Sequence, residues 1–201
     1  MASNKLPLSF YQQSNVVQLS KKLIGKVLCT QINGKLTSGL ITETEAYRGY
    51  DDKASHASGG KRTQRTETMF KNGGISYVYL CYGIHHLFNV VTNTANKPDA
   101  VLIRAIKPLQ GKETMLQRRN ASANSPSLTA GPGRLSQALG ITTANDALPL
   151  TGSTLWIEDR GDTFSDDMIT AKPRIGVDYA GDHASRPWRF FIHDSAWVSH
   201  K

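Results

Sequence analysis

Apolar and polar residues alternate along most of this chain, which predicts a protein built mainly from β-strands. Strands are expected where the alternation, or a short apolar run, lies between turn residues: at 26–32, 35–47, 75–92, 99–106, 154–159, 171–179 and 188–193. The Asn33-Gly34 pair joins the first two strands as a hairpin. Gly83 divides segment 75–92 into a second hairpin, with Tyr82 at its tip.

Helices are expected in three shorter segments, at 14–24, 108–119 and 131–139. Ser14 or Asn15 can cap the first helix, and Gly25 ends it. The polar stretches 48–71, 120–129 and 164–168 are expected to be loops.

Neither an internal repeat nor a linker divides the chain, so residues 1–201 are expected to form one domain. Its predicted class is mixed α/β (α+β): a mainly antiparallel, curved β-sheet flanked by short helices, with a protruding β-hairpin.

The end of the expected strand 35–47 carries two carboxylates and a tyrosine on one face. Side chains alternate between the two sides of a strand, so Glu43, Glu45 and Tyr47 point the same way if the strand stays regular. A buried carboxylate here is a candidate general base. The alternative is a solvated strand end with both carboxylates in water, and the spacing does not say which one would act.

Tyrosines are concentrated in the second hairpin. Tyr77 and Tyr79 share a strand face, and with Tyr47 they can form a slot for a flat ring, since bases stack on aromatic side chains. The alternative is that tyrosine is simply a good strand residue. Tyr82 is harder to explain in that way, because a hairpin tip is usually polar, and an aromatic tip can be a wedge between stacked bases.

Several polar residues interrupt apolar strands or begin a helix. Arg104 and Asn89 each need a partner or a function if they are buried, and a structural hydrogen bond is the alternative for both. Gly131-Pro-Gly133 lacks the signature of a phosphate loop, but it places Arg134 at a helix start, where an anion can bind.

The sequence gives little support for a metal-binding site or a reactive cysteine. His85 and His86 are adjacent and face opposite ways on a strand, and no spacing typical of zinc ligands occurs, so no metal is expected. Cys29 and Cys81 lie in apolar runs, which predicts two buried, reduced thiols in a cytoplasmic protein. Neither an apolar run of about 18 residues nor an apolar signal core is present, so neither a membrane span nor export is expected.

The charge favours an acidic partner. Formal net charge is +8 and the pI is 9.6, and a pI above about 9 is one feature of nucleic-acid-binding domains, although many basic proteins bind none. The basic residues fall into three clusters that phosphates would suit: Lys61, Arg62, Arg65 and Lys71; Arg104, Lys107, Lys112, Arg118 and Arg119; and Lys172, Arg174, Arg186 and Arg189.

The order of motifs along the chain resembles the alkyladenine (3-methyladenine) DNA glycosylase family, in its bacterial form. The motifs are Glu-Thr-Glu-Ala-Tyr, Ala-Ser-His, Thr-Met-Phe-Lys, Tyr-Val-Tyr-Leu-Cys-Tyr-Gly, Asn-Val-Val-Thr, Val-Leu-Ile-Arg-Ala and Gly-Pro-Gly-Arg-Leu, and the resemblance runs from Leu19 to Ser199. It implies a monofunctional enzyme of base excision repair that flips damaged purines out of the duplex and hydrolyses their N-glycosidic bond. The implied partner is double-stranded DNA in the bacterial nucleoid; we expect a monomer with neither metal nor organic cofactor.

The resemblance also implies roles for single residues. Glu45 would be the general base that activates a water, and Arg104 would hold Glu45 and that water. The flipped base would lie among Tyr47, His56, Tyr79 and Asn89. Tyr82 would fill the gap in the base stack, supported by Ile84 or His85, and phosphates would be bound by Lys61, Arg62, Arg65 and Arg134. Two rivals remain open: a protein that binds damaged DNA without cutting it, and a small-molecule acyl or formyl transferase.

Overall fold

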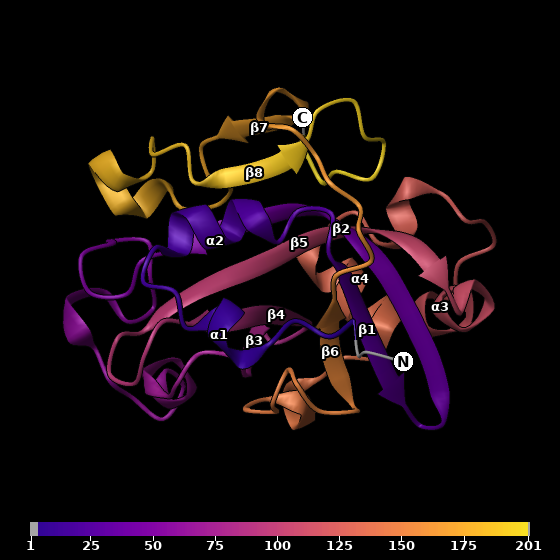
Figure 1. Cartoon of the computed structure of the whole chain (residues 1–201), viewed down its shortest axis with the longest axis horizontal. Coiled ribbons are helices and arrows are strands. Elements are labelled where there is room, and N and C mark those ends of the chain that lie inside the picture. The colour runs from indigo at the N-terminus through magenta and orange to yellow at the C-terminus, as the bar shows by residue number, and fades with distance from the viewer. Residues whose placement is uncertain (1–3, 201) are drawn as a thin grey trace.

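A computed structural model describes residues 4–200, and its centre is one eight-stranded, antiparallel sheet (Figure 1). The main path runs in the order β3-β4-β5-β2-β1-β6, while β8 pairs with the end of β2 and β7 pairs with β8. The strands are β1 Val27–Ile32, β2 Lys35–Tyr47, β3 Ser76–Cys81, β4 His85–Thr92, β5 Asp99–Gln110, β6 Leu155–Glu158, β7 Ile169–Lys172 and β8 Arg189–Ile192. The predicted class, a mixed fold around an antiparallel sheet, is confirmed.

Four short α-helices cover the sheet: α1 Leu8–Tyr11, α2 Val16–Lys22, α3 Lys112–Arg119 and α4 Pro132–Leu139. The side chain of Asn15 accepts a hydrogen bond from Gln18 N at 3.0 Å, so Asn15 is the cap that the sequence predicts for α2. Helix α2 packs on β2 and β5, and α4 packs on β4, β5 and α3. Their apolar side chains and those of the central strands form the main hydrophobic core.

The connecting segments contain short 3₁₀-helices at Ser58–Gly60, Glu67–Phe70, Pro126–Leu128, Thr143–Asn145, Asp166–Met168 and Asp178–His183. The expected loops at 48–71 and 120–129 therefore hold only short helical turns. Segment 164–168 differs slightly from its prediction, because its second half is one of these turns.

Strand β5 is longer than the predicted strand 99–106. It continues through Pro108, which pairs with Gly39 next to a register shift, a place where a strand tolerates proline. The helix predicted from residue 108 is consequently wrong at its start, and α3 begins only after Gly111, whose φ of +73° suits glycine.

The strand predicted over 171–179 is wrong for most of its length. Strand β7 ends at Lys172, and Asp178–His183 forms a 3₁₀-helix instead. Pro173 and Gly176, whose φ is +72°, interrupt the extended conformation. Between them the side chain of Arg174 enters the protein interior, which turns the chain away from the sheet edge.

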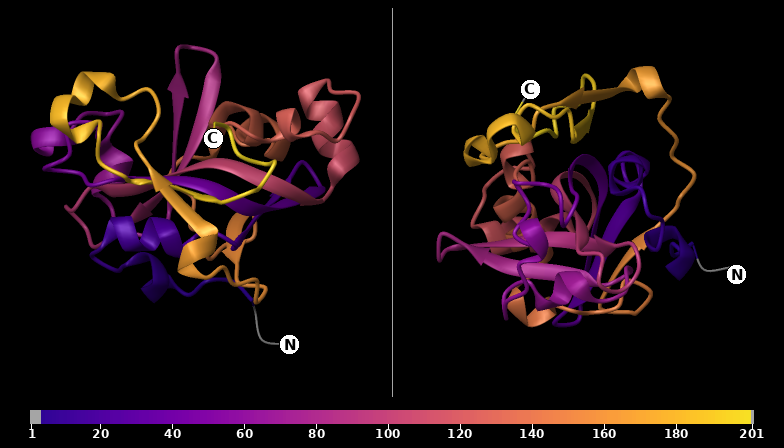
Figure 2. Two further views of the ribbon diagram at one scale, coloured as in Figure 1. Left: turned by 90° about the horizontal axis from the view of Figure 1, so that it is seen from above. Right: turned by 90° about the vertical axis from the view of Figure 1, so that its left-hand side faces the viewer.

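The hairpin of β3 and β4 stands out from the sheet (Figure 2). Tyr82 and Gly83 have positive φ values of 51° and 72°, and the turn lies between the paired residues Cys81 and His85. Cys29 is buried as predicted, but Cys81 is half-buried. The prediction of two buried thiols is therefore wrong for Cys81, because β3 leaves the core at that point.

Candidate active site

A cleft of about 870 Å³ opens where the end of β2, the β3–β4 hairpin, the start of α4 and segment 174–177 meet. The predicted site residues that line it are Tyr47, His56, Arg65, Tyr79, Tyr82, His85, Asn89, Arg104 and Arg134. Glu45 lies directly behind this lining, in contact with Tyr47 and Arg104. The cleft therefore gathers residues that are distant in the sequence around the carboxylate expected to act.

Glu45 is fully buried and surrounded by hydrogen-bond donors. Its Oε2 atom accepts from the Tyr47 hydroxyl at 2.8 Å and lies 3.2 Å from Arg104 Nη1. Its Oε1 atom accepts from the backbone N–H of Ile175 at 2.8 Å. An ionised carboxylate has about four acceptor positions, so about one is left for a further donor such as water. The alternative of a solvated strand end is wrong.

The bond between Glu45 and Tyr47 confirms that both side chains lie on the same side of β2. The strand is nevertheless irregular. The pairing of β2 with β5 leaves out Thr42 on β2 and Arg104 on β5. Glu43 pairs with Ala105, and the next residue, Thr44, pairs with Ile103. Such bulges re-aim side chains, and this one places the Arg104 guanidinium against the carboxylates of β2.

Glu43 is a second fully buried carboxylate, and it has four donors. Its Oε1 atom accepts from Arg104 Nε at 3.2 Å, Arg189 Nη1 at 3.0 Å and Ser199 Oγ at 3.0 Å. Its Oε2 atom accepts from Ser199 N at 2.7 Å. Burial lowers the pKa of Arg104, but the carboxylates of Glu45 and Glu43 outweigh it, so that pKa is raised overall. The centre thus balances two negative with two positive side chains.

Several aromatic side chains form one wall of the cleft. The ring centroids of His56 and Tyr79 are 4.7 Å apart with an edge-on angle of 78°, and His56 Nδ1 lies 3.1 Å from the Tyr77 hydroxyl. The guanidinium of Arg65 lies 4.9 Å from the centroid of the Tyr79 ring. Tyr77 is almost completely buried behind them. His56, Tyr77 and Tyr79 therefore lie together on this wall, with Tyr77 innermost.

The side chains of His56, Tyr79 and Tyr47 are uncharged at neutral pH. Burial, helped by the positive charge of Arg65, lowers the pKa of His56 to about 4. Burial raises the pKa of Tyr79. Burial and the adjacent Glu45 charge raise the pKa of Tyr47 well above its usual value of 10.0. A neutral, largely aromatic slot faces the cleft.

Asn89 lies in the lining and is buried. Its position on β4, opposite Tyr77 on β3 and Leu102 on β5, places it in the sheet itself. Its side-chain nitrogen donates to the Tyr77 carbonyl at 3.1 Å, so the amide orientation is set by the hairpin backbone.

The basic residues predicted to bind phosphate separate into two groups. Arg65 and Arg134 line the cleft. Lys61 and Arg62 lie outside its lining, and Arg62 forms an ion pair with Glu67 at 2.6 Å. The hairpin tip is divided in a similar way, since Tyr82 and His85 line the cleft while Ile84, 70% exposed, does not.

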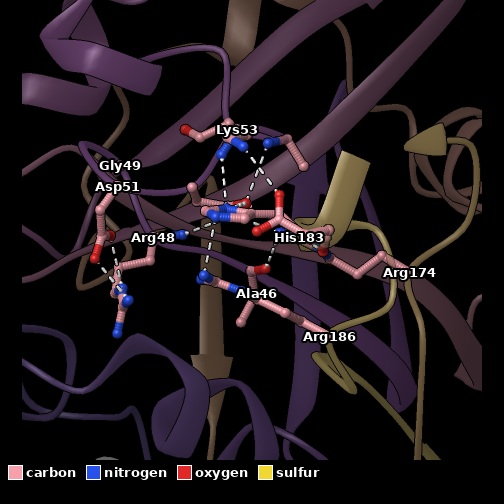
Figure 3. A network of polar contacts seen from close by, with 12 residues as sticks. Ala46, Arg48, Gly49, Asp51, Lys53, Arg174, His183 and Arg186 are labelled. Atoms are coloured by element: carbon pink, nitrogen blue, oxygen red, sulfur yellow. Dashed lines mark hydrogen bonds and ion pairs between the residues drawn. The ribbon is translucent and has the colours of Figure 1, made fainter. Parts of the chain in front are cut away.

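The third basic cluster of the sequence is corrected by the structure. Arg174 and Arg189 are buried ion-pair partners instead of surface groups for phosphate. Arg174 donates to both carboxylate oxygens of Asp52, to Ala46 O at 2.8 Å and to His183 O at 3.2 Å (Figure 3). Its guanidinium also lies 4.8 Å from the centroid of the Tyr47 ring. One arginine therefore holds the backbone of Ala46 and the ring of Tyr47, the two residues that follow Glu45.

Sequence reasoning missed three residues at this site, Ile175, Tyr179 and Ser199, and it assigned Arg189 to phosphates instead of to Glu43. Tyr179 lines the cleft, is 71% exposed, and donates its hydroxyl to Ala54 O at 3.1 Å. A polar side chain next to Phe190 and Phe191 was the one signal that could have marked Arg189. The contact of Ile175 is made by its backbone, which no side-chain pattern reveals.

Two kinds of feature are absent from residues 4–200. Within that part of the chain, no helix is long and apolar enough to cross a membrane. Among the same residues, no group of three or more His, Cys, Asp or Glu is placed to hold a metal ion.

Comparison with known proteins agrees with this geometry. The sequence model of the family described as Methylpurine-DNA glycosylase (MPG) matches residues 9–196. A Chlamydia felis protein named "Putative 3-methyladenine DNA glycosylase" is 49% identical over 190 residues, which cover 94% of this chain and 96% of that protein. A Bacillus cereus protein of the same name is 45% identical, with 97% and 98% covered. With a match over nearly its whole length and a buried carboxylate behind an aromatic cleft, this chain belongs to the methylpurine-DNA glycosylase family.

Proposed function

We propose that this protein is a monofunctional DNA glycosylase that flips an alkylated or deaminated purine, such as 3-methyladenine, out of duplex DNA and hydrolyses its N-glycosidic bond. The observation that carries the proposal is the Glu45 carboxylate, buried next to an aromatic cleft with three fixed donors and one acceptor position to spare. A base held in this way can orient one water and take its proton.

In the proposed step, a water bound to Glu45 attacks C1′ of the deoxyribose. The new bond joins the water oxygen to C1′, the water proton passes to Glu45, and the electron pair of the C1′–N bond leaves with the purine. An N-alkylated purine carries a positive charge and therefore leaves as a neutral base. A deaminated purine is uncharged and leaves as an anion, which then takes a proton from solvent water. Arg104, 3.2 Å from Glu45, holds the carboxylate in place. The step uses water and protein side chains, and the abasic site remains intact.

The slot formed by Tyr47, His56 and Tyr79 would hold the flipped base, with Asn89 beneath it. Stacking of a base on an aromatic side chain contributes about 1–3 kcal/mol. A cationic purine gains further from the negative face of an aromatic ring. Because the pKa of His56 is lowered to about 4, its imidazole adds no repelling charge at neutral pH.

Outside the slot, the exposed ring of Tyr82 would enter the gap left in the base stack, with His85 and Ile84 beside it. Arg65 and Arg134 at the cleft would contact phosphates near the lesion, and Lys61 and Arg62 would contact them further away. The partner is double-stranded DNA with damaged purines, bound by a monomer that consists of one glycosylase domain.

Replacement of Glu45 tests the proposal. Glu45→Gln keeps the shape of the side chain but removes the base, so release of 3-methyladenine from alkylated DNA, followed by chromatography, should slow about a thousandfold. Affinity for the modified duplex should stay close to that of the wild type. The control is Glu113→Gln on the exposed side of α3, which should release base normally.

The outcomes separate the rival functions. Wild-type protein that binds the modified duplex but releases no purine would be a binding protein without catalysis. If the wild-type protein neither binds the duplex nor releases a purine, the small-molecule acyl or formyl transferase is the rival function that remains. Release by Glu45→Gln at the wild-type rate would show that another group activates the water.

A further inference from the structure

The C-terminal tail reaches the buried carboxylates, although nothing in its sequence marks it as part of the site. The chain leaves β8, turns and returns to β2. Thr42 Oγ1 donates to Trp197 O at 2.5 Å, and Glu43 accepts from the backbone N–H of Ser199 at 2.7 Å. Two successive residues of β2 thus hold the tail in register.

Glu43 is not placed to act as a second base. All of its described partners are donors: Arg104 Nε, Arg189 Nη1, and both N and Oγ of Ser199. These four contacts match the roughly four acceptor positions of a carboxylate. Glu45, by contrast, has three described donors and one acceptor position to spare. The carboxylate of Glu43 can therefore position its neighbours but has no position left for a water.

The Ser199 hydroxyl links Glu43 to Arg104. It donates to Glu43 Oε1 at 3.0 Å and accepts from Arg104 Nη2 at 3.1 Å. Arg104 Nε donates to the same Glu43 oxygen at 3.2 Å. Since a guanidinium is planar and rigid, fixing its Nε and Nη2 groups also fixes the direction of Nη1. That nitrogen is the one that lies 3.2 Å from Glu45 Oε2.

We propose that Ser199 is a positioning residue, which together with Glu43 holds the Arg104 guanidinium so that Nη1 meets Glu45. The inference rests on the proposed function, in which Glu45 is the base that Arg104 holds in place. Loss of the hydroxyl leaves the contact of Nε with Glu43 as the described support of Arg104 apart from Glu45 itself, so the guanidinium can turn away from Glu45 more easily. Two of the aromatic side chains of the slot, His56 and Tyr79, come from other elements, so the step after base binding should suffer more than binding.

The test measures single-turnover release of hypoxanthine from a duplex, with enzyme in saturating excess, and the dissociation constant for the same duplex. Ser199→Ala should slow release about tenfold, as expected for a lost hydrogen bond to a charged group, and change affinity less than about twofold. Ser199→Thr keeps the hydroxyl at a half-buried site and should restore most of the rate. Ser195→Ala is the matched control, because its hydroxyl only accepts from Trp197 N within the same tail.

A double mutant and a spectroscopic measurement identify the route. In a Glu43→Gln background, adding Ser199→Ala should change the release rate less than about twofold, because both residues act through Arg104. In arginine labelled with nitrogen-15, the Arg104 Nε–H should exchange with water faster in Ser199→Ala than in the wild type or in Ser195→Ala, at an unchanged melting temperature.

Several results would overturn the inference. A wild-type release rate in Ser199→Ala does so, and so does an unchanged Arg104 Nε–H exchange. If the melting temperature is lower in Ser199→Ala than in the wild type, and is equally low in Ser199→Thr, the serine only anchors the tail. Failure of the wild-type protein to release any base overturns the proposed function instead, and the exchange measurement still decides whether Ser199 holds Arg104.

Discussion

The carboxylate centre and the hairpin tip represent opposite ways of building a functional region. At the centre, Glu43 and Glu45 are fully buried, and every contact described for them comes from a donor of fixed position. At the tip, Tyr82 is 92% exposed on a turn with positive φ. Buried charge is costly unless it is paired and hydrogen-bonded. Chemistry that needs a placed base thus requires the closed arrangement, whereas a surface that meets a partner stays open until the partner arrives.

The largest effect is expected from breaking the support behind the centre. Arg174→Met leaves Asp52 buried without its partner, which should lower the free energy of unfolding by about 3–5 kcal/mol, measured by urea denaturation. Base release by the folded fraction should fall as well, since Ile175 N–H and the Tyr47 ring depend on Arg174.

Arg186→Met is the matched control for this change. Arg186 lies 4.7 Å from the centroid of the Trp188 ring, which Arg174 also approaches, at 5.1 Å. Arg186 contacts His183 Nε2 at 2.9 Å but is half-buried, whereas Arg174 is buried. Its loss should cost about 0.5–1 kcal/mol. Equal costs for the two arginines would contradict the view that the inner one supports the centre.

An intermediate effect is expected at the tip. Tyr82→Ala should weaken binding to a lesion-containing duplex about tenfold, the lower part of the range for one lost stack, as measured by fluorescence anisotropy. Stability should not change, since the ring is exposed. Tyr82→Phe keeps the ring and should bind like the wild type. Unchanged affinity of Tyr82→Ala would remove the wedge role and leave the tip without a function.

The smallest effect concerns His56, which lies between the two regions. Its imidazole signal in NMR should titrate with a midpoint of about 4, instead of the usual 6.5. The folded state resists protonation, so the stability that neutral His56 provides is complete above pH 6.5 and is lost as the pH falls towards about 4. Arg65→Met removes the lesser cause of the shift and should raise the midpoint. A midpoint near 6.5 in the wild type would mean that the slot is more open to water than the structure indicates.

Local pattern alone predicted several parts of this protein. The alternation of side chains predicted that Glu45 and Tyr47 share a side of β2, and Gly83 predicted the hairpin with Tyr82 at its tip. Asn15 was recognisable as a helix cap. These features depend on residues that are close in sequence, where backbone geometry by itself decides the outcome.

Only the tertiary structure decided what meets those side chains. The bulge that aims Arg104, the Ile175 N–H on Glu45 and the Ser199 contacts with Glu43 join segments separated by 61, 130 and 156 residues. The predicted strand 171–179 failed for the same reason, since burial of Arg174 beside Asp52 outweighed strand preference. The period of two in a strand determines the face to which a side chain points. The packing of the whole chain determines which groups contact that side chain.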